Sequence, residues 1–338
     1  MKKTIPFLLL TLTILAFACS SSDNERLLQS TMKTRSINTD ITLSSWLSAI
    51  KNEALVAKLS LPGTHDAGAY KHGGSMAITQ DLTIEQQLEA GIRAMDIRLV
   101  AVNNDHLEIY HGVVAQELNF EYDVLAKVIQ FLNANPSETV VITLRKEQDD
   151  KNSPRGYIAI LREILEKPQY QPYIAQNFTA NATLGQLRGK ILFLSRDNIG
   201  QPFIGGQILG WADNTAFSRN IIGNINASAT VHVEDYYKVS SLFSGSINFK
   251  INEVTKNLSL ASGAVSNTDW FITFTSGTGV FAHPNAVAAR VNKPVADYIT
   301  NNSLQSCGIV LMDFAGWNDS KALTRAIIDC NFRLFTSN

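Results

Sequence analysis

Two histidines, an arginine and a carboxylate are spaced so that they could carry out proton-transfer chemistry on a phosphate. The stretch LSLPGTHDAGAY, residues 59–70, ends an apolar run with His65 and Asp66 side by side. Arg98 follows in MDIRLV and His111 in EIYHG. Histidines serve as general base and general acid because their pKa lies near the working pH, and a guanidinium fork binds phosphate oxygens. The set predicts phosphoryl transfer without a metal or any other cofactor.

Further charged side chains follow other β-rich apolar runs along the chain. In an α/β barrel the active site lies where the carboxyl ends of the strands meet. The residues expected there are Asp96, Arg145, Lys146, Glu147, Arg196, Asp197, Glu234, Asp235, Tyr237 and Asp313. The cations suit a phosphate, and the carboxylates can orient them. This mixture differs from the oxygen-only cage that Ca²⁺ or Mg²⁺ prefers.

Each of these residues also has an ordinary structural explanation. A histidine at a strand end commonly makes one structural hydrogen bond, Asp66 could cap a helix, and Arg196 could pair with Asp197 on the surface. For each residue taken singly, the structural explanation is preferred, except for His65. If the residues all lie at one end of one barrel, a functional explanation is preferred for the group. His72 is the reserve candidate because it is close to His65 in sequence. No catalytic role is assigned to His106, His232 or His283.

The elements that must position these residues alternate between strands and helices. Short β-rich apolar runs occur at 57–61, 92–100, 107–110, 139–144, 190–194, 229–233, 270–274 and 308–312. Between most of them the apolar residues recur every three to four positions, as at Val124, Val128 and Leu132, which is typical of helices. This alternation predicts a parallel sheet, and the number of strands predicts an irregular (β/α)8 barrel of the TIM type, forming a single catalytic domain.

Two positions depart from a regular barrel. The link from Val100 to Leu107 is shorter than the roughly dozen residues that a parallel crossover needs, so we expect a hairpin-like excursion or an irregular barrel segment there. Pro294 lies inside the helix-like stretch PNAVAARVNKPVADYITNN, and we expect it to kink or interrupt that helix.

The composition narrows the class of protein and of partner. The chain has 338 residues, of which 45% are hydrophobic and 17% charged, and this supports a substantial core. It has 29 basic and 30 acidic residues and a formal net charge of −1, with no Lys/Arg-rich run. We therefore expect no nucleic-acid partner, and we expect the protein to be a monomer.

The first residues are typical of an export signal. Met1, Lys2 and Lys3 form a positive start, and residues 5–17 form an apolar run too short for a comfortable membrane span. The following LAFACSSSDN resembles a bacterial lipoprotein cleavage site. We predict a signal peptide over 1–18, a tether headed by lipidated Cys19 over 19–43, and the barrel over 44–338, with the protein anchored in the cell envelope. The alternative is plain secretion after cleavage near Ala18.

Cys307 and Cys330 are the remaining cysteines. They could form a disulfide in an oxidising compartment, but two buried thiols are the favoured interpretation. Neither lies near a histidine in sequence, so we expect no metal site built on them.

Five motifs together resemble the bacterial phosphatidylinositol-specific phospholipases C. They are LSLPGTHDAGAY, AGIRAMDIRLV, IYHGVV, NPSETVVITLRKE and GKILFLSRD, and the resemblance extends from about residue 45 to the C-terminus. The succession of GTHD, DIR and HG is fairly specific as a set. The family's fold is an irregular α/β barrel, which agrees with the pattern of strands and helices.

The resemblance implies a role for each catalytic candidate. His65 in GTHD matches the general base that takes the proton of the inositol 2-hydroxyl, and His111 in YHG matches the general acid that protonates the departing diacylglycerol oxygen. Arg98 in DIR matches the arginine that stabilises the phosphate, a task that Ca²⁺ performs in metal-dependent relatives. Asp66 matches the carboxylate that pairs with this arginine. Asp313 in LMDFAG is the candidate for orienting the base.

Substrate contacts follow from the same resemblance. Arg145 stands where the family often has Lys, so its inositol contacts differ in geometry. Arg196, Asp235 and Tyr237 are similar to residues that hold the inositol, and a slip of one position would exchange Tyr237 for Tyr236. The implied substrate is phosphatidylinositol, free or as a glycosylated anchor, at a membrane surface. The implied products are diacylglycerol and inositol 1,2-cyclic phosphate.

Two other functions fit parts of the pattern. A metal-dependent glycerophosphodiesterase could use the same barrel, but it needs a carboxylate cage. A non-catalytic inositol-lipid binding barrel needs neither acid nor base, so the presence of both His65 and His111 argues against it. Trp211 and Trp317 could touch a bilayer or belong to the core.

Overall fold

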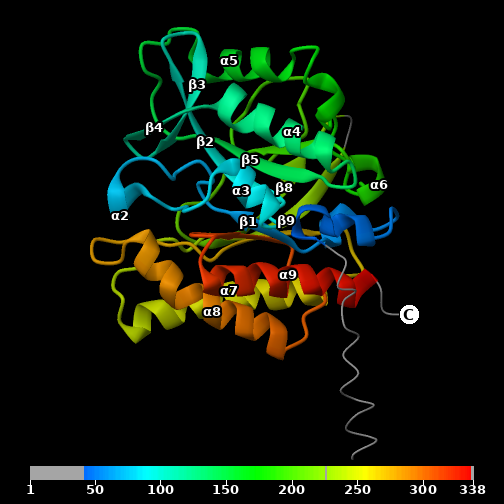
Figure 1. Ribbon diagram of the computed structural model, residues 1–338, viewed down its shortest axis with the longest axis vertical. Helices are drawn as coiled ribbons and strands as arrows, with labels where there is room; N and C mark the ends of the chain where they lie inside the picture. The colour runs from blue at the N-terminus through cyan, green and yellow to red at the C-terminus, as the bar shows by residue number, and fades with distance from the viewer. Residues whose placement is uncertain (1–41, 225–226, 336–338) are drawn as a thin grey trace, which may run out of the picture. The chain divides into compact units, whose positions relative to one another are not determined.

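Strands close into a barrel within residues 42–224 and 227–335, the part of the chain that this computed structural model describes (Figure 1). Around the ring the strands are β1 (Leu61–Thr64), β11 (Ile309–Met312), β10 (Trp270–Phe274), β9 (Ser228–Glu234), β8 (Ala216–Ile222), β7 (Gly206–Gln207), β6 (Ile191–Ser195), β5 (Val140–Lys146) and β2 (Ala94–Val102). Pairing of β1 with β2 closes the ring. All neighbours are parallel except at β8, which is antiparallel to β7 and β9. The irregular α/β barrel is therefore confirmed.

Helices cover the outside of the barrel (Figure 1). They are α2 (Gly74–Ala77), α3 (Ile84–Glu89), α4 (Ala126–Ala134), α5 (Gly156–Leu165), α6 (Leu184–Leu187), α7 (Ser244–Gly263), α8 (Pro284–Asn301) and α9 (Asn318–Phe335). Further segments, of 3-10 or π-helical geometry, are η1 (Leu43–Ala49), η2 (Val56–Lys58), η3 (Phe120–Leu125) and η4 (Gln171–Tyr173). The predicted spacing in α4 is met, because Val128 and Leu132 are both buried against the barrel.

The short link after β2 is a hairpin, one of the two predicted alternatives. β3 (His106–His111) turns back antiparallel to β2, and β4 (Val114–Asn119) pairs with β3 outside the ring. Asn103 and Asn104 make the turn with φ angles of 53° and 64°, which asparagine tolerates better than most residues. Because β3 reverses direction, its last residue returns to the barrel mouth.

Other differences from the predicted strands have physical causes. The run at 57–61 is buried, but Val56–Lys58 forms η2 and the strand begins only at Leu61, because burial alone does not distinguish a strand from a buried turn. β8 was not predicted, because most of its residues are exposed and it lacks an apolar run. β7 is only two residues long, and β4 lies at the edge of the sheet.

Two further expectations are decided by the structure. Pro294 does not interrupt α8, which runs from Pro284 to Asn301; its neighbours Val291 and Val295 are fully buried, and this packing outweighs the lost helical hydrogen bond. Cys307 and Cys330 are buried free thiols with their sulfur atoms 3.2 Å apart, as favoured.

The N-terminal predictions fall outside what the structure covers. The signal peptide and Cys19 lie outside the described residues, as does nearly all of the tether, and they stay predictions. Among the residues that are described, no helix is both long and apolar enough to cross a membrane.

Candidate active site

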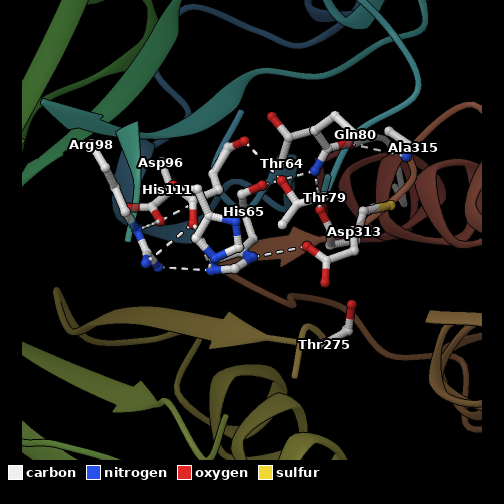
Figure 2. Close-up of polar contacts among 12 residues, drawn as sticks. Thr64, His65, Thr79, Gln80, Asp96, Arg98, His111, Thr275, Asp313 and Ala315 are labelled. Carbon is white, nitrogen blue, oxygen red and sulfur yellow. Dashed lines mark hydrogen bonds and ion pairs between the residues drawn. The ribbon is translucent and has the colours of Figure 1, made fainter. Parts of the chain in front are cut away.

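His65 and Asp313 meet because they directly follow two neighbouring strands. The pairing of β1 with β11 ends at Thr64 and Met312, so the next residue of each strand stands at the mouth. There Nδ1 of His65 lies 2.8 Å from Oδ1 of Asp313 (Figure 2). The first and last strands of the barrel thus assemble an imidazole–carboxylate pair that is separated by 248 positions in the sequence.

Arg98 contacts three groups of the site with its guanidinium fork. It lies within β2 rather than at its end, because β2 continues to Val102 beside β3. Its nitrogens lie 2.7 Å from Nε2 of His65, 3.1 Å from Oδ2 of Asp66 and 3.1 Å from Oδ2 of Asp96. A lysine has a single ammonium group and could not make these contacts together.

His111 enters the mouth from the excursion strand β3. Its Nδ1 lies 2.9 Å from the carbonyl oxygen of Ala77, so Nδ1 carries a proton and Nε2 points toward the site. Nε2 of His111 and Nε2 of His65 are each 3.6 Å from Oδ2 of Asp66. The ring centroids of the two histidines are 6.4 Å apart. β3 is the hairpin-like excursion that was one of the two predicted alternatives, and its reversal brings His111 to the predicted place.

The partners of His65 determine its tautomer. A guanidinium can only donate, so Nε2 accepts from Arg98 and the ring proton is on Nδ1, facing Asp313. Burial lowers the pKa of His65 well below its usual value, and the positive charge of Arg98 lowers it further. His65 is therefore held as a neutral base with its lone pair on Nε2.

The three buried carboxylates around the histidines differ in their pKa. Burial raises the pKa of Asp66 to about 6, against the opposing pull of Arg98. Burial, together with the charge of Asp66, raises the pKa of Asp313 well above its usual value. Burial would raise the pKa of Asp96 as well, but Arg196 and Arg98 outweigh it and hold that pKa well below its usual value. Asp96 is therefore the permanent anion of the site.

A pocket of about 520 Å³ opens above these groups. Its lining includes His65, Arg98, His111, Arg145, Arg196, Asp235 and Tyr237, which are all predicted site residues. Asp66 and Asp313 are 1% exposed and lie behind the histidines. The residues predicted to be catalytic or to bind inositol thus lie in or directly behind this pocket. Of the residues expected at the strand ends, Lys146 and Glu234 do not line it: Lys146 lies 3.0 Å from Asp150, and buried Glu234 lies 2.9 Å from Lys250.

The substrate-side residues of the pocket are linked to one another. The guanidinium of Arg196 lies 3.9 Å from the ring centroid of Trp211, and the indole of Trp211 donates to Asp235 at 2.8 Å. The hydroxyl of Tyr237 donates to Asp213 at 2.7 Å. The ring of Tyr236 packs against that of Phe249, with the ring centroids 5.1 Å apart. Tyr237, not Tyr236, therefore lies at the pocket.

The contacts of three further site residues were not specified by the sequence. Asp96 accepts from Arg98 and Arg196 and joins them, and Glu147 lies 3.6 Å from both Arg98 and Arg145. Both carboxylates were expected at the mouth, where they could orient the cations, but the sequence does not say which cations each one contacts. Trp211 lines the pocket, and its loop has no motif that would have shown this.

The remaining histidines and Trp317 lie elsewhere. His72 does not line the pocket and is 3.3 Å from Glu117 at the surface, so the reserve candidate is not needed. His232 stacks on Phe271, and Trp317 stacks on Phe314. No group of three or more His, Cys, Asp or Glu side chains able to hold a metal ion occurs in the ranges that the structure describes.

Comparisons with known proteins agree with this geometry. Residues 59–197 match the family model of the phosphatidylinositol-specific phospholipase C X domain. A 1-phosphatidylinositol phosphodiesterase of Listeria monocytogenes is 30% identical over 287 residues, covering 82% of this chain and 83% of the relative. A 1-phosphatidylinositol phosphodiesterase of Staphylococcus aureus is 28% identical over 310 residues, covering 85% of this chain and 94% of the relative.

Solved structures show the same relationship. A Staphylococcus aureus phosphatidylinositol-specific phospholipase C has a TM-score of 0.76 at 26% identity, covering 86% of this chain and 98% of that chain. The Listeria monocytogenes enzyme has a TM-score of 0.67 at 28% identity, covering 86% and 99%. The chain therefore belongs to the bacterial phosphatidylinositol-specific phospholipase C family.

Proposed function

We propose that this protein cleaves phosphatidylinositol into diacylglycerol and inositol 1,2-cyclic phosphate by metal-independent base–acid catalysis. The observation that carries the proposal is the placement of two imidazole Nε2 atoms, of His65 and His111, at one pocket and at equal distance from one carboxylate oxygen of Asp66. One ring is held neutral by its neighbours, and the other has its Nδ1 proton fixed by a carbonyl. Such a pair suits a reaction in which one histidine removes a proton from the substrate and the other donates a proton to the leaving group.

The first proton transfer uses His65. Its Nε2 lone pair takes the proton of the inositol 2-hydroxyl, and this oxygen attacks the adjacent phosphorus. The nucleophile belongs to the substrate itself, so positioning contributes much of the rate. Asp313 accepts the Nδ1 proton of His65 in a hydrogen bond and stabilises the imidazolium that forms.

The second proton transfer uses His111. The bond between phosphorus and the diacylglycerol oxygen breaks, and protonated Nε2 of His111 supplies the proton to that oxygen. Asp66 Oδ2 lies 3.6 Å from this nitrogen, and an ionised Asp66 can form an ion pair with the imidazolium of His111. The histidines end in exchanged protonation states, and no water is consumed in forming the cyclic product.

The arginines stabilise the negative charge of the phosphate. The side chain of Arg98 is 12% exposed, and although its desolvation alone would lower its pKa, the carboxylates around it raise the pKa above its usual value, so it stays charged. Its fork can stabilise the charge that builds on the phosphate oxygens. We assign inositol binding to Arg145, Arg196, Asp235 and Tyr237, which line the same pocket.

Exposed apolar side chains on segments beside the pocket suit the membrane surface from which such a substrate is taken. The apolar rim comprises Met76, Val113, Phe243, Val280 and Phe281, which are 71% to 84% exposed. Its loops adjoin the pocket lining at Gly112, Thr278 and Pro284. The loops also contact one another, since Ser75 bonds His283 and Lys238 pairs with Thr278. Exposed apolar patches of this kind mark interaction surfaces.

Export and lipidation complete the proposal. The predicted Cys19 lipid would hold the barrel near a membrane, and the tether over residues 19–43 would let the rim reach it. Substitution of Cys19 by serine should release the protein from the membrane fraction of cells without changing turnover by the purified barrel.

The deciding experiment is phosphorus NMR of the purified protein with phosphatidylinositol in detergent and excess EDTA. We expect the signal of inositol cyclic phosphate, lost in His65→Ala and retained in His72→Ala, whose ring lies outside the pocket. Turnover only with added Ca²⁺ would overturn the role of Arg98. No turnover under either condition, with vesicle binding retained in both variants, would identify a binding barrel.

A further inference from the structure

Gln80 lies outside the pocket, yet its side-chain amide joins the two loops that carry His65 and Asp313. It is fully buried between α2 and α3 and is absent from the pocket lining. Figure 2 shows its amide between the main chain of His65 and Ala315, beside Asp313. We propose that Gln80 is a positioning residue that fixes the base and its carboxylate partner relative to each other. The inference rests on the proposed function, in which His65 is the base.

The amide nitrogen of Gln80 binds both strand ends at once. Nε2 donates to the carbonyl oxygen of His65 at 2.8 Å and to that of Met312 at 2.9 Å. The oxygen of Met312 also accepts from the main-chain nitrogen of His65 at 3.0 Å. Because the pairing of β1 with β11 ends at Thr64 and Met312, the side chain of Gln80 adds one more bridge beyond it.

The amide oxygen and the neighbouring main chain bind the far side of the same loops. Oε1 of Gln80 accepts from the nitrogen of Ala315 at 3.3 Å. The carbonyl of Thr79 accepts from the nitrogen of Phe314 at 2.7 Å, and the hydroxyl of Thr79 donates to the carbonyl of Asp66 at 3.0 Å. Residues 79 and 80 therefore contact the main chain on both sides of the His65–Asp313 pair.

Both loops need such support because each contains a residue in a rare conformation. Asp66 has a φ of 42° and Phe314 a φ of 53°, in the left-handed region that non-glycine residues seldom adopt. Such a conformation persists where the surroundings over-determine it. These residues directly follow His65 and Asp313, so a relaxed loop would change the 2.8 Å contact of the pair.

Only a carboxamide of this length can make the whole set of contacts. It offers two N–H donors to the two carbonyls and one acceptor to the N–H of Ala315. A glutamate of the same shape would place an oxygen against two carbonyl oxygens. A methionine would fill the volume but leave all three groups unbonded.

The test compares Gln80→Met and Gln80→Glu with Asn331→Asp as a matched control. Asn331 is also fully buried, and its amide also clamps β1, bonding both the nitrogen and the oxygen of Ser60 at 2.9 Å, but at the other end of the strand. We expect the Gln80 variants to lower kcat by about 10- to 100-fold, as for a displacement of about 1 Å in a catalytic pair, with KM nearly unchanged. We expect Asn331→Asp to lower the melting temperature without this loss in kcat.

A double variant separates positioning from general loosening. If Gln80 acts through the His65–Asp313 contact, Gln80→Met should add little to the loss caused by Asp313→Asn. The proton NMR signal of Nδ1–H of His65 gives a readout that does not depend on any substrate. We expect this signal to shift or broaden in the Gln80 variants that circular dichroism shows to be folded, and to stay unchanged in Asn331→Asp.

The possible outcomes separate this inference from the proposed function. Turnover of phosphatidylinositol by the unaltered protein tests the function alone. Three outcomes would each overturn the positioning role. The kcat losses of Gln80→Met and Asp313→Asn could multiply in the double variant, or Asn331→Asp could lower kcat as much as the Gln80 variants do. The third is an unchanged Nδ1–H signal of His65 in the Gln80 variants. Should neither Gln80 variant fold, while Asn331→Asp does, the residue would be assigned to folding instead.

Discussion

Nη2 of Arg98 lies 2.7 Å from Nε2 of His65, so the guanidinium donates to the same lone pair with which the base would accept a proton. A phosphate bound at the mouth competes for that guanidinium, since its oxygens accept the same N–H groups. We therefore expect binding of an anionic substrate to free the Nε2 lone pair of His65 from Arg98. Arg98 also affects His65 through its charge, because this positive charge is one cause of the lowered pKa of His65.

Substitution of Arg98 by methionine should therefore raise the pKa of His65 as well as abolish turnover. The sign follows from the loss of a nearby positive charge, which had disfavoured the imidazolium. Histidine NMR titration checks it, and kcat should fall about 100- to 1000-fold, as for the loss of a key charge-stabilising donor. Arg98→Lys should keep part of the pKa effect but little of the rate, because one ammonium replaces a fork. An unchanged pKa in Arg98→Met would contradict the coupling.

Asp313→Asn should lower kcat by about 100-fold or more with little change in KM. An amide at this position can present its NH₂ group to His65, and this favours the tautomer with the proton on Nε2, where the lone pair is needed. Steady-state kinetics on a soluble substrate measures the effect. A rise in KM at constant kcat would show instead that Asp313 serves substrate binding.

Turnover should decline as the pH falls through about 6, the raised pKa of Asp66. Below it the buried carboxyl becomes neutral, and both Arg98 and His111 lose their shared counter-charge. His65 would not cause this decline, since its own pKa is lowered well below the usual histidine value. A pH profile of kcat/KM measures this limb, which should be missing from the residual activity of Asp66→Asn.

The same carboxyl makes a prediction about stability. A carboxyl whose pKa is raised in the folded state costs stability once ionised, so the unmodified protein loses stability as the pH rises from the usual aspartate range to about 6. Asp66→Asn removes this cost. Its melting temperature should exceed that of the unmodified protein at about pH 8, with a smaller difference at about pH 5. Equal differences at the two pH values would rule out the raised pKa.

The apolar rim should matter for vesicles and not for soluble substrate. Val280 and Phe281 are 82% and 79% exposed, and burying side chains of this size in lipid is worth about 1.5 to 3 kcal/mol each. Val280→Ser with Phe281→Ser should weaken binding to phosphatidylinositol vesicles by about 100-fold while a short-chain monomeric substrate turns over normally. Leu260→Ser is the control, because Leu260 is 54% exposed on α7, away from the pocket lining. Equal loss in the control would show that the rim has no special role.

The sequence allowed the barrel and most of the site to be predicted where local patterns carry the information. β5, β6, β10 and β11 are apolar runs buried on almost every residue, so their composition identifies them. β8 could not be found this way, because its exposed residues break the pattern and its place depends on its neighbours β7 and β9.

The same distinction applies to the site. His65, Arg98 and His111 lie in short motifs and could be identified from them. The contribution of Gln80 could not, because it consists of hydrogen bonds to main-chain atoms of residues that are distant in sequence, such as Met312 and Ala315. Trp211 was missed for a similar reason, since only the fold places its indole between Arg196 and Asp235.

Because β1 pairs with β11, we expect activity only from a chain that includes both strands. His65 is near the beginning of the barrel and Asp313 near its end, and each depends on the other's strand for its place. A ribosome-bound or truncated chain that ends before Ile309 lacks the strand that supports β1 on this side and the carboxylate that orients the base. We therefore expect a chain that ends before Ile309 to show no turnover of phosphatidylinositol.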